Sequence, residues 1–186
     1  DAISAAIAKI QTAKLPVVLV GMKGGRPEAI KAVRKLLKKV QLPFVKTYQA
    51  AGTLSRDLED QYFGRIGLFR NQPGDLLLEQ ADVVLTIGYD PIEYDPKFWN
   101  VNGDRTIIHL DEIIADIDHA YQPDLELIGD IPSTINHIEH DAVKVEFAER
   151  EQKILSDLKQ YMHEGEQVPA DWKSDRAHPL EIVKEL

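Results

Sequence analysis

The chain has 186 residues, of which 44% are hydrophobic and 28% charged, a balance typical of an ordinary globular domain with a sizeable core. Its net charge of −9 argues against a nucleic-acid partner or an anionic membrane, because both favour a basic face. The absence of cysteine excludes disulfides, thiolate metal sites and cysteine nucleophiles. No apolar run approaches membrane-spanning length and no signal-peptide pattern is present, so we expect a cytoplasmic location.

Apolar periodicity predicts strands and helices that alternate along the chain. The predicted strands are residues 17–20, 43–48, 82–88, 105–110 and 124–128, and the predicted helices are residues 2–13, 27–40, 73–80, 131–140, 147–162 and 178–186. Such alternation favours a parallel sheet, because each crossover returns the chain to the same end of the sheet. We therefore expect an α/β fold, a Rossmann-like doubly wound parallel sheet of five to six strands flanked by helices. Because the sequence begins without methionine inside a predicted helix, we expect it to be a piece of a longer chain.

Residues 50–70 are predicted to form a long irregular segment, interrupted by Gly52, Tyr62, Gly64 and Gly67. Loops longer than about 12–15 residues inside a compact domain are usually functional or flexible. This segment is therefore a candidate site.

The turn after the first predicted strand is a candidate phosphate site. Gly21, Gly24 and Gly25 lie between that strand and a helix with Pro27 in its first turn, so free helix N–H groups would point into the crevice above the sheet. The alternative is that the glycines only allow a tight turn. Both interpretations stay open, because Gly21-Met22-Lys23-Gly24-Gly25 matches neither the G-x-G-x-x-G pattern nor the loop that ends in lysine and a hydroxyl residue.

Other chemistry-bearing residues give weaker indications. His137 and His140 have a spacing on a predicted helix that can hold a metal ion, but the sequence places no third ligand, and a solvated helix face is the better interpretation. Asp111, at the end of a predicted strand, either contacts a ribose or caps the following turn. An acidic group between strands is interpreted as a solvated loop: Asp90, Glu93, Asp95 and Asp104. No G-x-S-x-G pattern is present, and we predict no catalytic residue in this chain.

Three segments occur in an informative order: LPVVLVGMKGG at 15–25, YFGRIGLFR at 62–70 and ADVVLTIG at 81–88. Together they resemble the central domain of thiamine-diphosphate-dependent enzymes of the acetohydroxyacid synthase and pyruvate oxidase group. The longer segment GLFRNQPGDLLLEQADVVLTIGYDPIEYDPKFW is similar to the catabolic, FAD-independent acetolactate synthases of acetoin-forming bacteria. The resemblance covers nearly the whole chain. It implies a central domain over 1–165, a linker over 166–177 and the start of the following diphosphate-binding domain over 178–186.

The resemblance implies a three-domain parent enzyme that condenses two pyruvates to 2-acetolactate and releases carbon dioxide. Thiamine diphosphate and Mg2+ would be held by the other domains of the same chain, so the fragment alone is predicted to be inactive, with no catalytic or metal-binding residue. The parent is expected to be a homodimer or homotetramer. The alternatives are an independent nucleotide- or FAD-binding module and a non-catalytic interaction domain.

The resemblance also assigns roles to named residues. FAD-binding relatives mostly carry Gly-Ala-Arg-Phe where this chain has Gly88-Tyr89-Asp90-Pro91, so FAD binding is not expected. The predicted, and possibly vestigial, cofactor-binding residues are Gly21, Lys23, Gly24, Gly25 and Gly88. The predicted substrate-pocket loop consists of Gly67, Leu68, Phe69 and Arg70. In this loop, Gly67 would let the backbone extend away from the domain, and Arg70 could meet a pyruvate carboxylate. The alternative is that Leu68 and Phe69 anchor the loop to the core.

Overall fold

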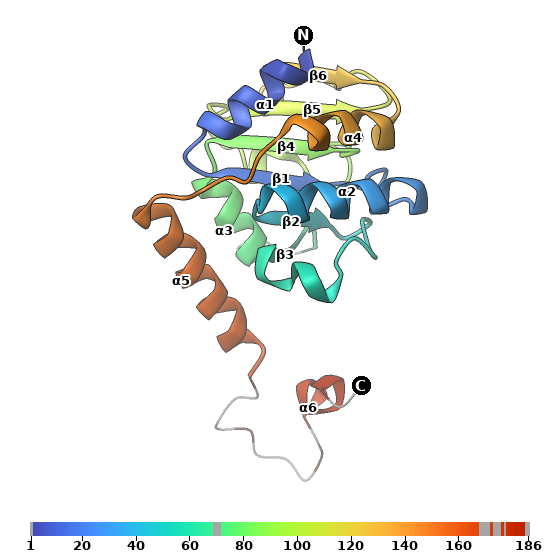
Figure 1. Cartoon of the computed structure of the whole chain (residues 1–186). Coiled ribbons are helices and arrows are strands. Elements are labelled where there is room, and N and C mark those ends of the chain that lie inside the picture. The colour runs from blue at the N-terminus through green and yellow to red at the C-terminus, as the bar shows by residue number, and fades with distance from the viewer. Residues whose placement is uncertain (1, 69–71, 168–171, 173–175, 177, 185–186) are drawn as a thin grey trace.

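Six parallel strands form one sheet in the order β3-β2-β1-β4-β5-β6 (Figure 1). The computed structural model describes residues 2–68, 72–167, 172, 176 and 178–184. The strands are β1 (Pro16–Val20), β2 (Phe44–Thr47), β3 (Tyr62–Ile66), β4 (Val83–Ile87), β5 (Thr106–Asp111) and β6 (Leu125–Ile128). This order confirms the predicted doubly wound sheet. Its strand sequence reverses between β1 and β4, which is the switch point where such folds usually bind ligands.

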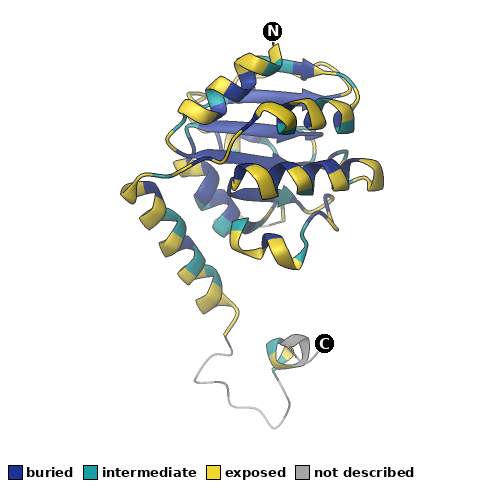
Figure 2. Cartoon of the chain, in the orientation of Figure 1, coloured by how far each residue is buried: buried dark blue, intermediate teal, exposed yellow. Residues whose placement is uncertain are grey.

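Helices cover both faces of the sheet. They are α1 (Ala2–Thr12), α2 (Pro27–Val40), α3 (Pro73–Gln80), α4 (Ile131–Asp141), α5 (Glu149–Gly165) and α6 (Pro179–Lys184), with short 3-10 helices η1 (Arg56–Gln61) and η2 (Pro96–Phe98). One apolar cluster joins α1, α2 and α4 to the sheet, and a second joins α3 and α5 to the opposite face. Figure 2 shows the strands buried between helices whose outer sides are exposed.

The strand β1 is apolar at every position because both of its faces are covered. Val18 and Val20 belong to the cluster under α2, whereas Val17 and Leu19 belong to the cluster on the other face. This alternation follows from the two-residue period of a strand. The unbroken apolar run in the sequence therefore reflects a central strand.

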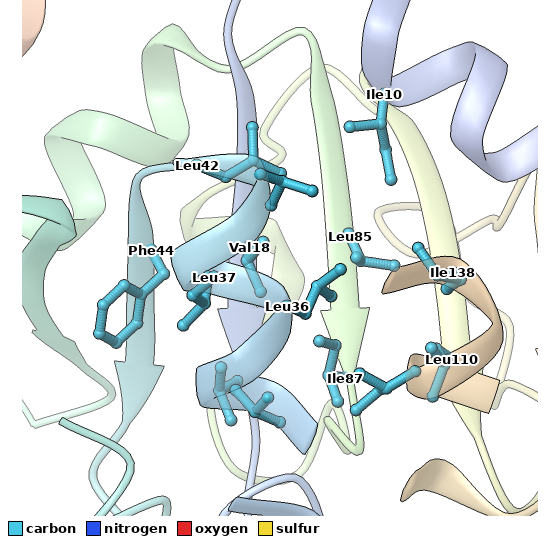
Figure 3. Packing of buried hydrophobic residues seen from close by; sticks show 14 of the residues in the cluster. Ile10, Val18, Leu36, Leu37, Leu42, Phe44, Leu85, Ile87, Leu110 and Ile138 are labelled. Carbon is cyan, nitrogen blue, oxygen red and sulfur yellow. The ribbon is translucent and has the colours of Figure 1, made fainter. Parts of the chain in front are cut away.

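The first cluster fixes α2 against the centre of the sheet. Leu36 and Leu37 of α2 lie over Val18 and Leu85, with Ile138 of α4 beside them (Figure 3). Each fully buried aliphatic side chain of this kind contributes about 1.5–3 kcal/mol relative to an exposed one. The packing holds the first turn of α2, and the glycine-rich turn before it, at the carboxyl edge of the sheet.

The prediction of one irregular segment over residues 50–70 is wrong. This stretch contains η1 and the edge strand β3, which pairs with β2 through a register irregularity between Phe44 and Lys46. The strand escaped prediction because Gly64, with φ at 101°, interrupts its pattern, and pairing with β2 decides its conformation. Gly64 thus belongs to β3 and not to an irregular segment. The helix α5 also begins two residues later and ends three residues later than expected, at Glu149 and Gly165.

Candidate functional site

The glycine-rich turn lies at the switch point, where β1 and β4 end side by side. The Gly21 N–H donates to the Ile87 carbonyl at 3.0 Å. A Cβ on Gly21 would lie 2.3 Å from the Cα of Tyr89, and one on Gly88, whose φ is 59°, would lie 2.4 Å from the Gly24 nitrogen. Glycine is therefore required here so that two strand-end turns can pack backbone against backbone.

Lys23, the cation of this turn, is paired inside the chain. Its Nζ donates to Oδ1 of Asp111 at 2.6 Å, and the two side chains are 13% and 1% exposed. Asp111 is the last residue of β5, and the same oxygen accepts the N–H groups of Glu112 at 2.6 Å and Ile113 at 3.3 Å. Of the two interpretations offered for Asp111, the turn cap is confirmed. Both charges at this point of the crevice are satisfied by each other.

A second carboxylate, that of Glu93, lies across the ends of three strands. Its two oxygens lie 3.1 and 3.0 Å from the Met22 nitrogen, whose N–H they accept, and one of them accepts the Asp90 N–H at 3.1 Å. The other oxygen accepts the hydroxyl of Thr47 at 2.6 Å. Met22 follows β1, Asp90 follows β4 and Thr47 ends β2. The prediction of a solvated acidic loop is therefore wrong for Glu93, and no local sequence pattern identifies it.

The predicted substrate-pocket loop leaves the sheet directly after β3. Gly67 has φ at 100°, and a Cβ on it would lie 3.3 Å from the Glu93 carbonyl oxygen. Leu68 is 47% exposed, so the alternative in which it anchors the loop to the core is wrong for this residue. Phe69 and Arg70 lie outside the described residues.

The hollow near the predicted nucleotide crevice is small. It measures about 40 Å³ and is lined by residues that include Lys23, Tyr89, Asp111 and Ile113. Small-molecule sites are roughly 300–1,000 Å³. Larger hollows of about 450 and 340 Å³ lie elsewhere, beside β3 and the end of α5, and both include Tyr62 and Glu166 in their lining.

Sequence reasoning missed a buried polar network on the face of the sheet opposite α2. His109 of β5 places Nε2 3.1 Å from the Ile113 carbonyl, so this nitrogen carries a proton and Nδ1 is left to accept the Tyr121 hydroxyl at 2.8 Å. The same hydroxyl lies 2.8 Å from that of Thr86. Burial raises the pKa of Tyr121. The network packs against the aromatic rings of Tyr89 and Trp99, which lie in the connection between β4 and β5.

The histidine pair on α4 lies on a solvated face, as the sequence indicated. His137 and His140 are exposed, and their Nδ1 atoms lie 2.8 Å from the Ser133 carbonyl and 2.6 Å from Asp141. Across the described residues, no three histidine or acidic side chains come together in a way that could hold a metal ion. In the same part of the chain, no helix has the length and apolar character needed to cross a membrane.

Residues 3–138 match the family described as the central domain of thiamine pyrophosphate enzymes. The chain is 99% identical over 186 residues to an acetolactate synthase of Bacillus subtilis (strain 168) and 35% identical over 190 residues to a catabolic acetolactate synthase of Raoultella terrigena. Both alignments cover 100% of this chain and 33% of the relative. The chain is also 28% identical over 141 residues to a pyruvate oxidase of Lactiplantibacillus plantarum, covering 75% of this chain and 22% of that protein. It thus spans about a third of the length of the first two relatives.

Proposed function

Because the chain belongs to the family of thiamine pyrophosphate enzyme central domains, we propose that it is the central domain of an acetolactate synthase. The complete enzyme would join two pyruvates into 2-acetolactate and release carbon dioxide. The observation that carries the proposal is the 99% identity to an acetolactate synthase over the whole chain. We further propose that residues 1–165 form this domain, that residues 166–177 are a linker to the next, and that the enzyme works in the cytoplasm.

Thiamine diphosphate and Mg2+ are proposed to lie in the other domains of the parent enzyme. Two observations support this placement. The sequence contains no Gly-Asp-Gly run, and the described residues offer no cluster of metal ligands. This chain would therefore supply shape and contacts around a reaction that the neighbouring domains carry out.

FAD is proposed to be absent from the parent enzyme. A flavin pyrophosphate is normally met by free N–H groups and often by a cation, but Asp111 neutralises Lys23 and Glu93 accepts the Met22 N–H. A hollow of about 40 Å³ is also too small for a flavin. The predicted cofactor-binding residues would then serve packing instead: Gly21, Lys23, Gly24, Gly25 and Gly88.

The carboxyl edge of the sheet is proposed to face the rest of the enzyme. Exposed apolar side chains follow five successive strands along the chain: Met22, Tyr48, Leu68, Ile92, Ile113, Ile114 and Ile117. Apolar surface concentrated in this way marks contacts with other domains or subunits. Since Leu68 belongs to the predicted substrate-pocket loop, this edge would lie toward the active site in a homodimer or homotetramer.

Acetolactate formation from pyruvate, thiamine diphosphate and Mg2+ tests the proposal directly. We expect activity from the full-length protein and none from residues 1–186 alone. A full-length protein that releases no carbon dioxide from pyruvate, or an active isolated chain, would contradict it. To test the flavin proposal, the protein is mixed with excess FAD, separated from free FAD by gel filtration and examined for visible absorption. The proposal predicts a colourless protein.

The role of the loop is tested by Leu68→Ala in the full-length enzyme. We expect a changed KM for pyruvate with unchanged thermal stability, because Leu68 lies outside both buried core clusters of this domain. The matched control is Val143→Ala, which removes part of a side chain that is 59% exposed in the segment between α4 and α5. Equal kinetics in the two variants would argue against a substrate-pocket role for Leu68.

A further inference from the structure

The groups that hold the Glu93 carboxylate come from three separate segments of the chain. The N–H groups of Met22 and Asp90 and the hydroxyl of Thr47 converge on it at 2.6–3.1 Å. All three are neutral dipoles, and converging backbone N–H groups of this kind form anion-binding concavities in proteins. They lie beside the switch point of the sheet, where ligands bind in related folds.

We propose that these donors form a binding site for a small carboxylate anion, and that Glu93 occupies it as a built-in ligand. The site exists because parallel strands end together, which brings donors after β1, β2 and β4 within reach of one another. Glu93 reaches them from the loop after β4.

The Asp90 donor is fixed by contacts that do not involve the Glu93 side chain. Two hydrogen bonds from backbone N–H groups close the turn over residues 90–93. The Glu93 N–H donates to the Asp90 carbonyl at 2.9 Å, and the Ile92 N–H donates to the Asp90 carboxylate at 3.0 Å. The buried hydroxyl of Tyr89 donates to the carbonyl of Tyr94. Removing the carboxylate should therefore leave the turn, and the Asp90 N–H with it, in place.

The space around the carboxylate fits a small anion. A Cβ on Gly21 would lie 2.8 Å from Oε1 of Glu93, so the turn leaves room for the two oxygens and little more. Glu93→Ala deletes the terminal methylene and carboxylate, which together have the heavy atoms of acetate. Acetate is therefore the probe that matches the vacated volume and charge.

The test is thermal unfolding of the full-length protein that contains this chain, in acetate and in chloride at equal pH and ionic strength. In chloride, Glu93→Ala should lower Tm by roughly 4–10 °C, since it removes charge-assisted hydrogen bonds. Acetate should restore most of this loss in a saturable way, as expected for a ligand that binds the folded state. Acetamide, which has the same shape and no charge, should not.

Three proteins serve as controls. Wild type should show no selective response to acetate, because its site is filled, and Glu112→Ala, which removes an exposed carboxylate at the same edge, should behave like wild type. Glu93→Gln should lose less stability than Glu93→Ala and should not respond to acetate, because the amide still fills the site. If Glu93→Ala does not fold, its refolding yield in acetate against chloride gives the same comparison.

The proposal is overturned if Glu93→Ala is as stable as wild type. It is equally overturned if acetate, acetamide and chloride act alike on this variant. Neither readout depends on turnover of pyruvate, so a failure here is distinguishable from a failure of the proposed acetolactate synthase activity.

Discussion

Replacing Lys23 by methionine tests whether the cation of the glycine-rich turn is structural. The substitution keeps an unbranched side chain and removes the ammonium group that lies 2.6 Å from Asp111. If Lys23 were held ready for a ligand phosphate, its loss would leave the ligand-free protein almost unchanged. If it neutralises Asp111, its loss leaves a carboxylate that is 1% exposed without a counter-charge.

The cost follows from what remains around Asp111. Removing one partner of a buried ion pair costs about 3–5 kcal/mol. Asp111 retains two backbone N–H donors, from Glu112 and Ile113, and the site of Lys23 is 13% exposed, so water can partly replace the lysine. We therefore expect about 3 kcal/mol, or a fall in Tm of roughly 6–12 °C for a domain of this size.

Urea unfolding followed by tryptophan fluorescence measures this loss, because Trp99 is fully buried. The matched control is Arg26→Met, which breaks the neighbouring pair with Glu112. Those side chains are 46% and 44% exposed, so the control should cost less than about 1 kcal/mol. Adding Asp111→Asn to Lys23→Met should recover part of the loss, because no buried charge is then left unpaired.

The result that would refute this reasoning is a Lys23→Met protein as stable as Arg26→Met. It would mean that Lys23 does not stabilise the fold through Asp111. The Lys23 ammonium would then be free to meet a flavin pyrophosphate.

Three further predictions concern packing, buried hydrogen bonds and pH. Gly21→Ala should prevent stable folding, because its Cβ would meet backbone atoms at 2.3 and 2.5 Å, whereas Gly165→Ala, with nothing within 4 Å, should leave the urea midpoint unchanged or raised. Tyr121→Phe should cost about 1–3 kcal/mol in urea unfolding, since two buried partners lose a hydrogen bond; a neutral result would contradict the network. The Lys38 ammonium holds the pKa of Asp57 at about 2, so the stabilisation from this pair is present above pH 3.8 and is lost as the pH falls toward 2. Carboxyl NMR should show that pKa rising toward 3.8 in Lys38→Met, and an unchanged value would argue against the pairing.

The sequence by itself determined the class of fold and most of its elements. Strands β1 and β4 and helix α2 were predicted from local apolar periodicity, because a central strand and an amphipathic helix must bury those side chains wherever they lie. The glycine turn after β1 was also predicted. These features depend on neighbours a few residues apart.

The tertiary structure decided what the candidate site contains. Lys23 meets Asp111 from 88 residues away, and Glu93 meets Met22 from 71 residues away, distances over which no periodicity carries information. The strand β3 depends in the same way on pairing with β2, since Gly64 weakens its own pattern. Parallel pairing brings the strand ends to one edge, and only there do the glycines, the lysine and the two carboxylates become one packed site whose carboxylates find their partners within the chain.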